Sequence, residues 1–436
     1  MRIAVVGSGI SGLSAAWLLA EGHDVTIYER NGYLGGHTHT VDVDWDGRAL
    51  SVDTGFIVYN EQNYPNLTQW FEHLGVETQD SDMSFAVSLD QGALEYGGTL
   101  RQLVAQPENL LRPRFHRMLV DLLRFYRQAP AVLTSGEAGS LGDYLARHRY
   151  STAFIHDHLL PMAAAIWSCP AETMLQFPVS SFVRFCTNHG LLSLTRRPHW
   201  RTVTGGGRQY VRRAATRLAG GIRLGQPVQA IRRGQAGAFL READGQERVF
   251  DQVILACHGD EALALLSDAD EDERRLLGAF RYERNEVVLH RDPNLMPCRR
   301  SVWSSWNYLS EVGATHRRVA VTYWMNRLQG IDPRFPLFVS LNPTQAPAAE
   351  TVFGQWSYDH PVFDAEAVRA QGRIHQIQGR RRTWFCGAHL GFGFHEDGLR
   401  SGIAVARGLG ANVPWDCDVE PAGPPPAPFS GERLSG

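Results

Sequence analysis

A glycine-rich turn close to the N-terminus constrains the fold more than any other feature of this sequence. Residues 7–12, Gly-Ser-Gly-Ile-Ser-Gly, match the pattern G-x-G-x-x-G. An apolar run of strand length, 2–6, precedes the turn, and a helical pattern over 11–21 opens within it. A second strand is expected at 25–28. This order predicts a Rossmann-type β-α-β unit that binds a dinucleotide.

Each glycine of the motif has a physical role in such a unit. Gly7 permits the tight turn, Gly9 lets the backbone approach a pyrophosphate, and Gly12 allows close packing of helix on strand. The first N–H groups of the helix, around Ile10 and Ser11, carry partial positive charge and favour an anion. The motif therefore predicts a phosphate site at this helix N-terminus.

Two features downstream extend the predicted site, and each has a plainer alternative. Glu29 ends the second strand, where a carboxylate can accept both hydroxyls of an adenosine ribose and repel a 2′-phosphate. The alternative is a solvated acid at a strand end. Gly35–Gly36 allow a second close approach of backbone to the pyrophosphate, unless they form an ordinary loop.

Taken together, residues 2–36 resemble the N-terminus of FAD enzymes of the amine oxidase and phytoene desaturase superfamily. The resemblance covers about residues 1–412. It implies FAD as the cofactor, and a helix N-terminus placed against the isoalloxazine, where it suits the negative charge of a reduced flavin. The later segments that resemble the superfamily are 52–56 beside the flavin, 204–207, 227–231 at the adenine, 253–256, 384–388, 397–398 and 401–402.

The motif and the resemblance together imply one set of cofactor-binding residues. In the superfamily an arginine often follows the glycine pair, and here His37 takes that place, either as a donor to phosphate or as a loop histidine that contacts backbone. The set is Gly7, Gly9, Ile10, Ser11, Gly12, Glu29, Arg30, Gly35, Gly36, His37, Thr54, Gly55, Val228, Gly387, Asp397 and Gly398.

One bacterial subgroup is the most similar, the predicted NAD/FAD-binding amine oxidoreductases associated with cyclopropane-fatty-acid-synthase-like methyltransferases. Segments 188–192, 323–326 and 393–398 resemble theirs. This resemblance implies a hydrophobic or lipid substrate, with methyl-branched fatty acyl chains as candidates.

The chain departs from its relatives because its 43 basic residues are all arginine. Typical amine oxidases hold a lysine near flavin N5, and that arrangement is impossible here. No second G-x-G-x-x-G with strand and helix context occurs, so a separate NAD(P)H domain is not expected. The electron acceptor is left open.

Three residues are candidates for catalysis. His395 and Glu396 directly precede the helix expected at the flavin, where a base can assist hydride transfer. Alternatively, Glu396 and Asp397 cap that helix and His395 is a structural partner. His199 lies between Pro198 and Trp200, and either faces the pocket or is a core histidine.

Residues Arg112–Arg127 carry five arginines and one aspartate, with apolar residues at helical spacing. A basic amphipathic helix of this kind can lie in an anionic membrane interface. The alternative is a domain helix whose arginine face meets water.

Composition excludes several other classes. The net charge of −3 gives no reason to expect nucleic acid binding. The six cysteines are scattered without a CxxC pair, so we expect reduced thiols and no metal site. A strand from residue 2 leaves no room for a signal peptide, and no apolar run is long enough to span a bilayer. We expect a cytoplasmic protein, or one peripheral to the inner face of the membrane.

We therefore predict an α/β fold in which a Rossmann-type FAD-binding domain is interleaved with a substrate domain of mixed sheet and helices. The FAD-binding domain takes 1–80, 201–275 and 371–413, the substrate domain 81–200 and 276–370, and 414–436 form a disordered Pro-rich tail. The predicted function is FAD-dependent dehydrogenation, or desaturation, of a hydrophobic substrate by hydride transfer to flavin N5. The alternatives are a non-redox isomerase or hydratase, an amine-oxidase-like enzyme without the lysine, and a non-enzymatic FAD-binding protein.

Overall fold

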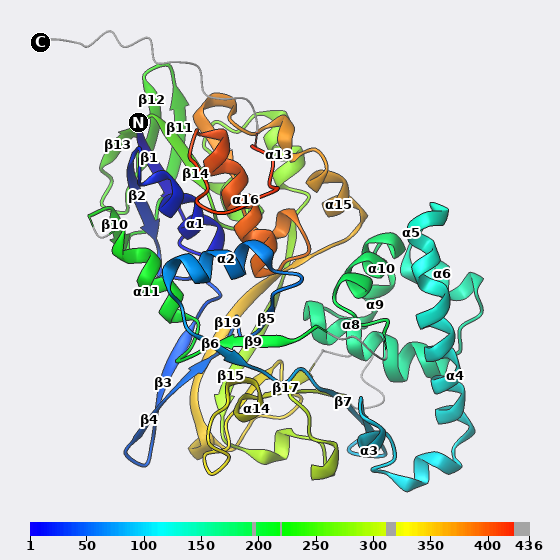
Figure 1. The fold of residues 1–436 in the computed structure, drawn as a ribbon. Coiled ribbons are helices and arrows are strands. Elements are labelled where there is room, and N and C mark those ends of the chain that lie inside the picture. The colour runs from blue at the N-terminus through cyan, green and yellow to red at the C-terminus, as the bar shows by residue number, and fades with distance from the viewer. Residues whose placement is uncertain (194–197, 219, 311–319, 423–436) are drawn as a thin grey trace, which may run out of the picture. The chain divides into compact units, whose positions relative to one another are not determined.

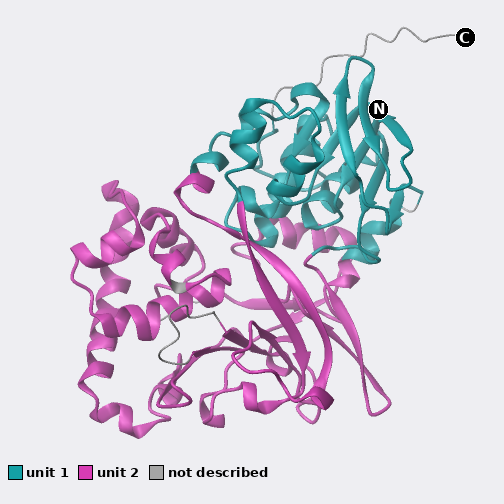
Figure 2. Ribbon diagram, turned by 180° about the vertical axis from the view of Figure 1, so that it is seen from behind, with its two compact units in different colours: residues 1–36, 211–280, 369–436 teal, residues 37–210, 281–368 magenta. Residues whose placement is uncertain are grey.

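The computed structural model describes residues 1–193, 198–218, 220–310 and 320–422. The chain divides into two compact units, which Figure 2 colours separately. Unit 1 contains Met1–Gly36, Val211–Phe280 and Arg369–Gly436, and unit 2 contains His37–Tyr210 and Arg281–Val368. The chain passes from unit 2 to unit 1 within two helices, α11 Arg208–Thr216 and α15 Ala365–Gln371.

Unit 1 is built on a five-stranded parallel sheet with strand order β10-β2-β1-β14-β20. All ten residues of α1 are buried, and α1 packs along α16 (Figure 1). The α/β prediction is confirmed here. The bounds are β1 Arg2–Val6, α1 Ile10–Leu19, β2 Asp24–Glu29, β10 Ile222–Leu224, β14 Gln252–Leu255, β20 Thr383–Phe385 and α16 His395–Gly408.

A smaller antiparallel sheet and several helices complete unit 1. Its first strand, β11, begins at Ala230, after Pro227, which has no N–H to donate to a neighbouring strand. The bounds are β11 Ala230–Gly234, β12 Gly237–Arg241, β13 Glu247–Phe250, α12 Gly259–Leu265, α13 Glu271–Leu277, η7 Ile374–Gln376, η8 Arg380–Arg382 and η9 Ala388–Leu390.

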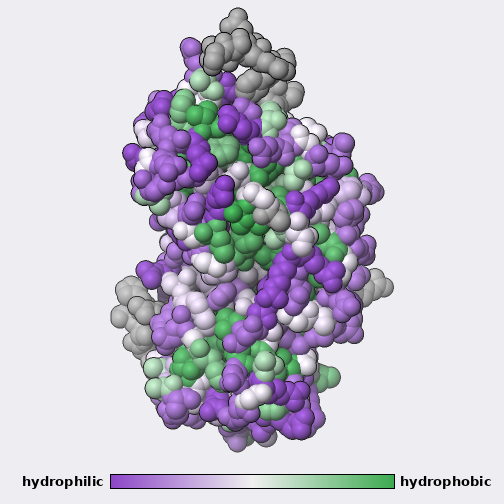
Figure 3. Space-filling model, turned by 90° about the vertical axis from the view of Figure 1, so that its left-hand side faces the viewer, coloured by the Kyte–Doolittle hydropathy of each residue, from purple (hydrophilic) through white to green (hydrophobic). Residues whose placement is uncertain are grey.

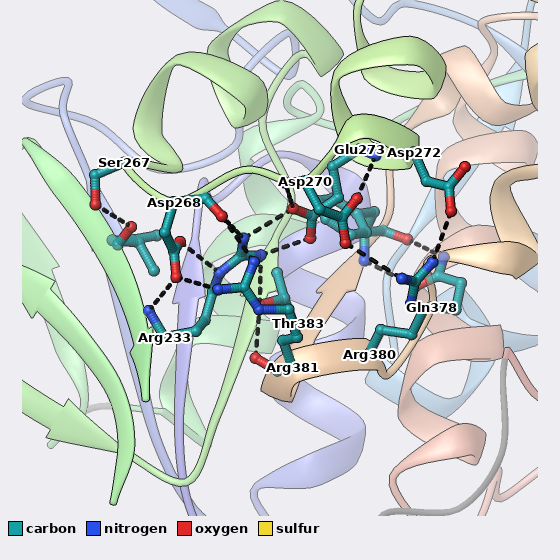
Figure 4. Close-up of polar contacts among 12 residues, drawn as sticks. Arg233, Ser267, Asp268, Asp270, Asp272, Glu273, Gln378, Arg380, Arg381 and Thr383 are labelled. Carbon is teal, nitrogen blue, oxygen red and sulfur yellow. Dashed lines mark hydrogen bonds and ion pairs between the residues drawn. The ribbon is translucent and has the colours of Figure 1, made fainter. Parts of the chain in front are cut away.

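A buried ion-pair cluster joins β11, α13 and η8 (Figure 4). The Arg233 guanidinium contacts Glu273 at 2.6 Å and Asp268 at 2.8 Å, and the side chains of Arg233 and Glu273 are each 1% exposed. In η8, Arg380 pairs with Asp270 and Arg381 pairs with Asp268. The cluster therefore fixes the position of η8, which leads directly into β20 and then into the segment that begins at Gly387.

Unit 2 contains a seven-stranded mixed sheet with order β19-β15-β18-β17-β16-β7-β8. β16 and β7 pair in parallel, and the other neighbours are antiparallel, as a mixed substrate-domain sheet predicts. β7 and β8 form an antiparallel hairpin. The bounds are β7 Phe85–Leu89, β8 Leu94–Gly97, β15 Arg281–His290, β16 Trp306–Ser310, β17 Ala320–Trp324, β18 Phe338–Leu341 and β19 Val352–Val362.

Helices and two small sheets surround this sheet within unit 2 (Figure 1). The small sheets are β3 Thr40–Trp45 with β4 Arg48–Asp53, and β5 Tyr59–Asn60 with β9 Trp200–Val203 and β6 Thr78–Asp80. The helices are α2 Pro65–Leu74, α3 Leu100–Leu103, η1 Pro107–Leu111, α4 Pro113–Gln128, η2 Ala129–Ala131, α5 Val132–Ser135, α6 Leu141–Arg147, α7 Thr152–Phe154, the π-turn η3 Ile155–Leu159, α8 Leu160–Trp167, α9 Ala171–Leu175, α10 Val179–Asn188, η4 Pro293–Leu295, η5 Arg300–Val302, α14 Met325–Gln329 and η6 Ala349–Thr351.

The two units do not follow the predicted domain boundaries everywhere. Residues 37–80 and 201–210, predicted for the FAD-binding domain, lie in unit 2 because β5 and β6 pair with β9. The compact units do not show which segments contact a cofactor, so the division into cofactor and substrate domains stays a prediction.

The predicted disorder of the tail is wrong for its first part. Ala422 donates to the Ala404 carbonyl at 2.8 Å, and Trp415 stacks on Trp17 at 6.3 Å between ring centroids. This segment packs on α16 and α1 because its tryptophan and Val419 bury apolar surface. Residues 423–436 lie outside the described part of the chain.

Candidate functional site

The residues predicted to hold the phosphates, which we call the cradle, lie where two glycine segments of unit 1 meet. A methyl group on Gly9 would have no atom within 4 Å, whereas one on Gly36 would lie 3.0 Å from the Gly9 Cα. Gly35 donates its N–H to the Ser8 carbonyl at 3.1 Å and has φ of +114°. The backbones of the motif and of the glycine pair thus touch, and the space over Gly9 is open.

The start of α1 at this cradle suits an anion. Gly9 is the N-cap, no side chain caps the helix, and its first turn carries no acid. The N–H groups there and the helix dipole are therefore directed at the open space.

Glu29 is buried and holds the glycine turn. Its Oε2 accepts the Ser8 N–H at 3.0 Å and the Ser8 hydroxyl at 2.6 Å, and its Oε1 accepts the Asn31 N–H at 2.8 Å. The alternative of a solvated acid is wrong, because Glu29 is 5% exposed. Ribose binding stays a prediction. Ser8 was missed because it occupies a variable position of the motif.

Gly12 and Gly398 are required by packing inside unit 1. A methyl on Gly12 would lie 2.1 Å from the Gly7 carbonyl oxygen. A methyl on Gly398 would lie 2.6 Å from a side-chain carbon of Ile10 and 3.0 Å from the Ser11 hydroxyl. Ile10 and Ser11 thus contact α16 with their side chains, and their backbone N–H groups are what they can offer to a phosphate.

The predicted adenine-side residues lie at the end of β2. Arg30 pairs with Glu261 at 2.6 Å. Val228 is half-buried in the coil before β11, and Gln226 in that coil donates to the Glu29 carbonyl at 2.9 Å. The coil that was expected to meet adenine therefore runs beside Glu29.

The C-terminal motif forms the start of α16. Asp397 accepts the Phe394 N–H at 3.0 Å and so caps the helix, as the alternative interpretation of this residue predicted. Burial raises the pKa of Asp397 to about 6. Burial lowers the pKa of His395 to about 3, so its imidazole is neutral and only weakly basic. Glu396 is buried. Gly387 lies against the His389 ring, which a methyl there would meet at 2.4 Å.

In unit 2, His37, Thr54 and Gly55 meet a group that the sequence did not reveal. The Thr54 hydroxyl lies 2.7 Å from the Tyr358 hydroxyl and 3.0 Å from His39 Nδ1, which is 2.9 Å from the same Tyr358 hydroxyl. The His37 ring centroid lies 5.2 Å from that of Tyr358. We call His39, Thr54 and Tyr358 the polar triad.

Burial lowers the pKa of His39, so its imidazole is neutral at neutral pH and available as a proton acceptor. Gly55 is required because a methyl there would lie 2.1 Å from the His37 carbonyl oxygen. No local pattern marks the polar triad, since Tyr358 is 319 residues from His39.

Asp53, directly before Thr54, is 1% exposed and orders this turn. Its carboxylate accepts the Thr40 hydroxyl at 2.5 Å, the Gly207 N–H at 2.9 Å and the Gln329 amide at 2.9 Å. Burial raises the pKa of Asp53 to about 7, and this effect outweighs the hydrogen bonds from Thr40 and Gly207, which lower the pKa.

His199 is neither in the core nor beside the polar triad. Its side chain is 63% exposed and lies 3.4 Å from Asp80 at the surface of unit 2. The core interpretation is wrong because His199 precedes β9, where the chain is still in contact with solvent.

A cleft of about 630 Å³ opens in unit 2 at the β15–β19 edge. Its lining includes Ser168, Cys169, Glu283, Asn285 and Trp356, and the Trp356 ring centroid lies 5.2 Å from that of His39. Burial raises the pKa of Cys169 to about 12, so this thiol stays protonated. The volume suits a medium-sized organic ligand.

The residues of the cradle fit the pyrophosphate of a dinucleotide flavin. The open position over Gly9, the uncapped α1 and the contact with Gly36 are the features such a group needs.

Several known proteins are similar to this chain in sequence or in fold. The family model described as flavin containing amine oxidoreductase matches residues 10–284. A 15-cis-phytoene desaturase of Synechococcus elongatus is 38% identical over 81 residues, 18% of this chain and 16% of that protein. A carotenoid phi-ring synthase of Streptomyces griseus is 31% identical over 191 residues, 39% of this chain and 35% of that protein. The matched parts are thus well under two thirds of either relative.

A solved structure described as a CLA-producing fatty acid isomerase from P. acnes shares the fold. Its TM-score is 0.65 at 16% identity, and the match covers 93% of this chain and 98% of the other.

Proposed function

The chain belongs to the flavin-containing amine oxidoreductase family, and from that premise we propose that this flavin-dependent oxidoreductase uses its FAD to desaturate a hydrophobic substrate. The candidate substrate is a fatty acyl chain, which includes methyl-branched chains. The association with a methyltransferase is part of the same proposal.

The observation that carries the proposal is the absence of lysine from the whole sequence. Amine oxidases of the superfamily place a lysine near N5, and no arginine can replace it as a neutral amine, because the guanidinium stays protonated. Oxidation of a carbon–carbon bond is the alternative chemistry, and the relative with the higher identity bears the name of a desaturase.

Desaturation removes a hydride from one carbon and a proton from its neighbour, and leaves a carbon–carbon double bond. When bound, the flavin supplies the acceptor for the hydride and its two electrons. We assign the proton to the imidazole of His39 in the polar triad, and the Tyr358 hydroxyl, 2.9 Å from Nδ1, keeps that ring oriented.

The other candidates are less suited to hold that proton. The pKa of His395, lowered to about 3, makes its imidazole a poor base near neutral pH. His199 is exposed and pairs with Asp80. Glu396 stays a candidate, because it is buried in the first turn of α16.

Anaerobic reduction of the bound flavin tests the proposal. The holoprotein is mixed with detergent-dispersed cellular lipid without oxygen, and the visible flavin band is followed. Bleaching, together with a product two hydrogens lighter, is expected. A product of unchanged mass with the flavin still oxidised would instead indicate an isomerase, and bleaching by amines alone would contradict the proposed substrate class.

A further inference from the structure

The exposed apolar side chains of the described chain are concentrated in one segment of unit 2. Seven large apolar residues are exposed by more than 40%, and six of them lie within 100–123. The six are Leu100 at 85%, Val104 at 47%, Leu110 at 45%, Leu111 at 86%, Val120 at 59% and Leu123 at 54%. Five of them belong to α3, η1 and α4, which follow one another at the lower right of Figure 1, and Val104 is the C-cap of α3.

The rest of the described chain differs in this respect. The face in Figure 3 shows hydrophobic residues between hydrophilic ones, yet Leu224 is the one large apolar side chain outside 100–123 that exceeds 40% exposure among the described residues. Isolated exposed leucines are common, whereas a concentration of this kind marks an interaction surface.

The same segment is strongly basic. Residues 100–128 contain six arginines and two acids, an excess of four positive charges in a chain whose net charge is −3. One acid, Asp121, is fully buried and paired with Arg117 and Arg124. Arg114 pairs with Asp157, so three positive charges remain when that acid is counted.

The direction of α4 in the fold explains why these side chains are outside. Its inner face is Phe115, Met118, Asp121 and Phe125, all buried. Val120 and Leu123 therefore point away from unit 2, next to the arginines of the helix.

We propose that α3, η1 and α4 form a docking surface for an anionic lipid bilayer, with the leucines inserted at the interface and the arginines at the headgroups. Charge complementarity favours an anionic bilayer as the occupant, because an excess of arginines lies beside the exposed leucines, as in helices that bind in the interface of an anionic membrane. Among the described residues, no helix is long and apolar enough to cross a membrane.

Vesicle sedimentation tests this surface. The probes are phosphatidylcholine vesicles with and without phosphatidylglycerol, mixed with the holoprotein at low and high salt and without substrate. We expect binding to the phosphatidylglycerol vesicles that weakens with salt. Leu100→Ser/Leu111→Ser lowers the bound fraction at least tenfold, whereas Leu224→Ser, the matched apolar control in unit 1, leaves it unchanged.

A second pair separates charge from apolar contact. Arg101→Gln/Arg127→Gln reduces binding to the anionic vesicles alone, and Arg223→Gln, at an exposed position of β10, is its control. Each variant is compared with the parent in melting temperature and flavin content, so that misfolding is recognised. Equal binding by parent and both double variants overturns the proposal. Dimerisation of the parent that is lost in Leu100→Ser/Leu111→Ser also overturns it, in favour of a second copy of the chain.

The flavin-reduction assay in detergent needs no bilayer. Loss of vesicle binding with intact flavin reduction, or the reverse, therefore distinguishes failure of the surface from failure of the proposed function.

Discussion

Substitution of Gly9 by alanine separates the cofactor site from the fold that carries it. Gly9 has φ −62° and ψ 177°, which alanine adopts without strain, and a methyl there meets no protein atom within 4 Å. The helix keeps its N-cap backbone. We therefore expect Gly9→Ala to change the stability of the apoprotein by less than about 1 kcal/mol.

The same methyl occupies the space assigned to the pyrophosphate. If the phosphates approach the Gly9 backbone, Gly9→Ala should weaken FAD binding at least about tenfold, which corresponds to about 1.4 kcal/mol. Gly12→Ala is the matched contrast, because its methyl lies 2.1 Å from the Gly7 carbonyl oxygen and 2.9 Å from the Ala256 Cβ. That variant should lose about 1–3 kcal/mol or more of stability before any cofactor is added.

Thermal unfolding of the apoproteins with and without added FAD measures both quantities, since a ligand that binds the folded state raises the melting temperature by mass action. Gly9→Ala is expected to melt with the parent as apoprotein and to gain less from FAD, whereas Gly12→Ala melts lower throughout. Unchanged FAD affinity in Gly9→Ala would show that the pyrophosphate does not pass over this residue, and the assignment of the cradle would be wrong.

Three further predictions concern stability and catalysis. Arg233→Ala leaves the buried Glu273 carboxylate unpaired and should lower the free energy of unfolding in urea by about 3–5 kcal/mol. Arg275→Ala, the control, breaks an exposed pair and should lower it by less than about 1 kcal/mol. Similar losses in the two variants would contradict the burial argument. Tyr358→Phe should lower kcat by about 10²-fold or more and alter its pH profile while flavin content is kept; an unchanged profile would remove the polar triad from the reaction. The free energy of unfolding should fall as the pH drops from about 6.5 to about 4, because histidines whose pKa is lowered in the folded state take up protons first in the unfolded chain. His158→Phe should flatten the plot of stability against pH between those values. The histidines whose pKa burial lowers to about 3 or 4 are His158, His189, His290, His389 and His395, and they outnumber Asp53 and Asp397, whose raised pKa values act in the opposite direction.

The strand, turn and helix at the N-terminus were predictable because the sequence signals for them lie within one short segment. Strand, turn and helix at 2–21 follow from apolar periodicity and from three glycines whose spacing has one physical use. The helices after the hairpin β7–β8 are also bounded by local signals, since Pro107 and Pro113 are the first residues of η1 and α4.

What could not be predicted depends on contacts between distant segments. The polar triad joins residues 39, 54 and 358, and no single window of sequence contains them. The prolines of the tail predicted disorder. The structure shows that Trp415 stacks on Trp17, a contact between distant residues that composition does not indicate. His199 seemed protected by its proline and tryptophan neighbours, but exposure is set by where β9 begins.

Glu29 shows what the structure adds to the glycine-rich motif. A carboxylate offers about four acceptor positions, and Ser8 and Asn31 already fill three of them with N–H and O–H donors. One position on Oε1 is left, so Glu29 can take one ribose hydroxyl directly, and a second only if the Ser8 hydroxyl rotates away from Oε2. The charge is therefore oriented by the protein before a cofactor arrives. The bonds that orient Glu29 also hold the Ser8 backbone beside Gly9, so the positions predicted for the ribose and for the phosphates are ordered by one side chain.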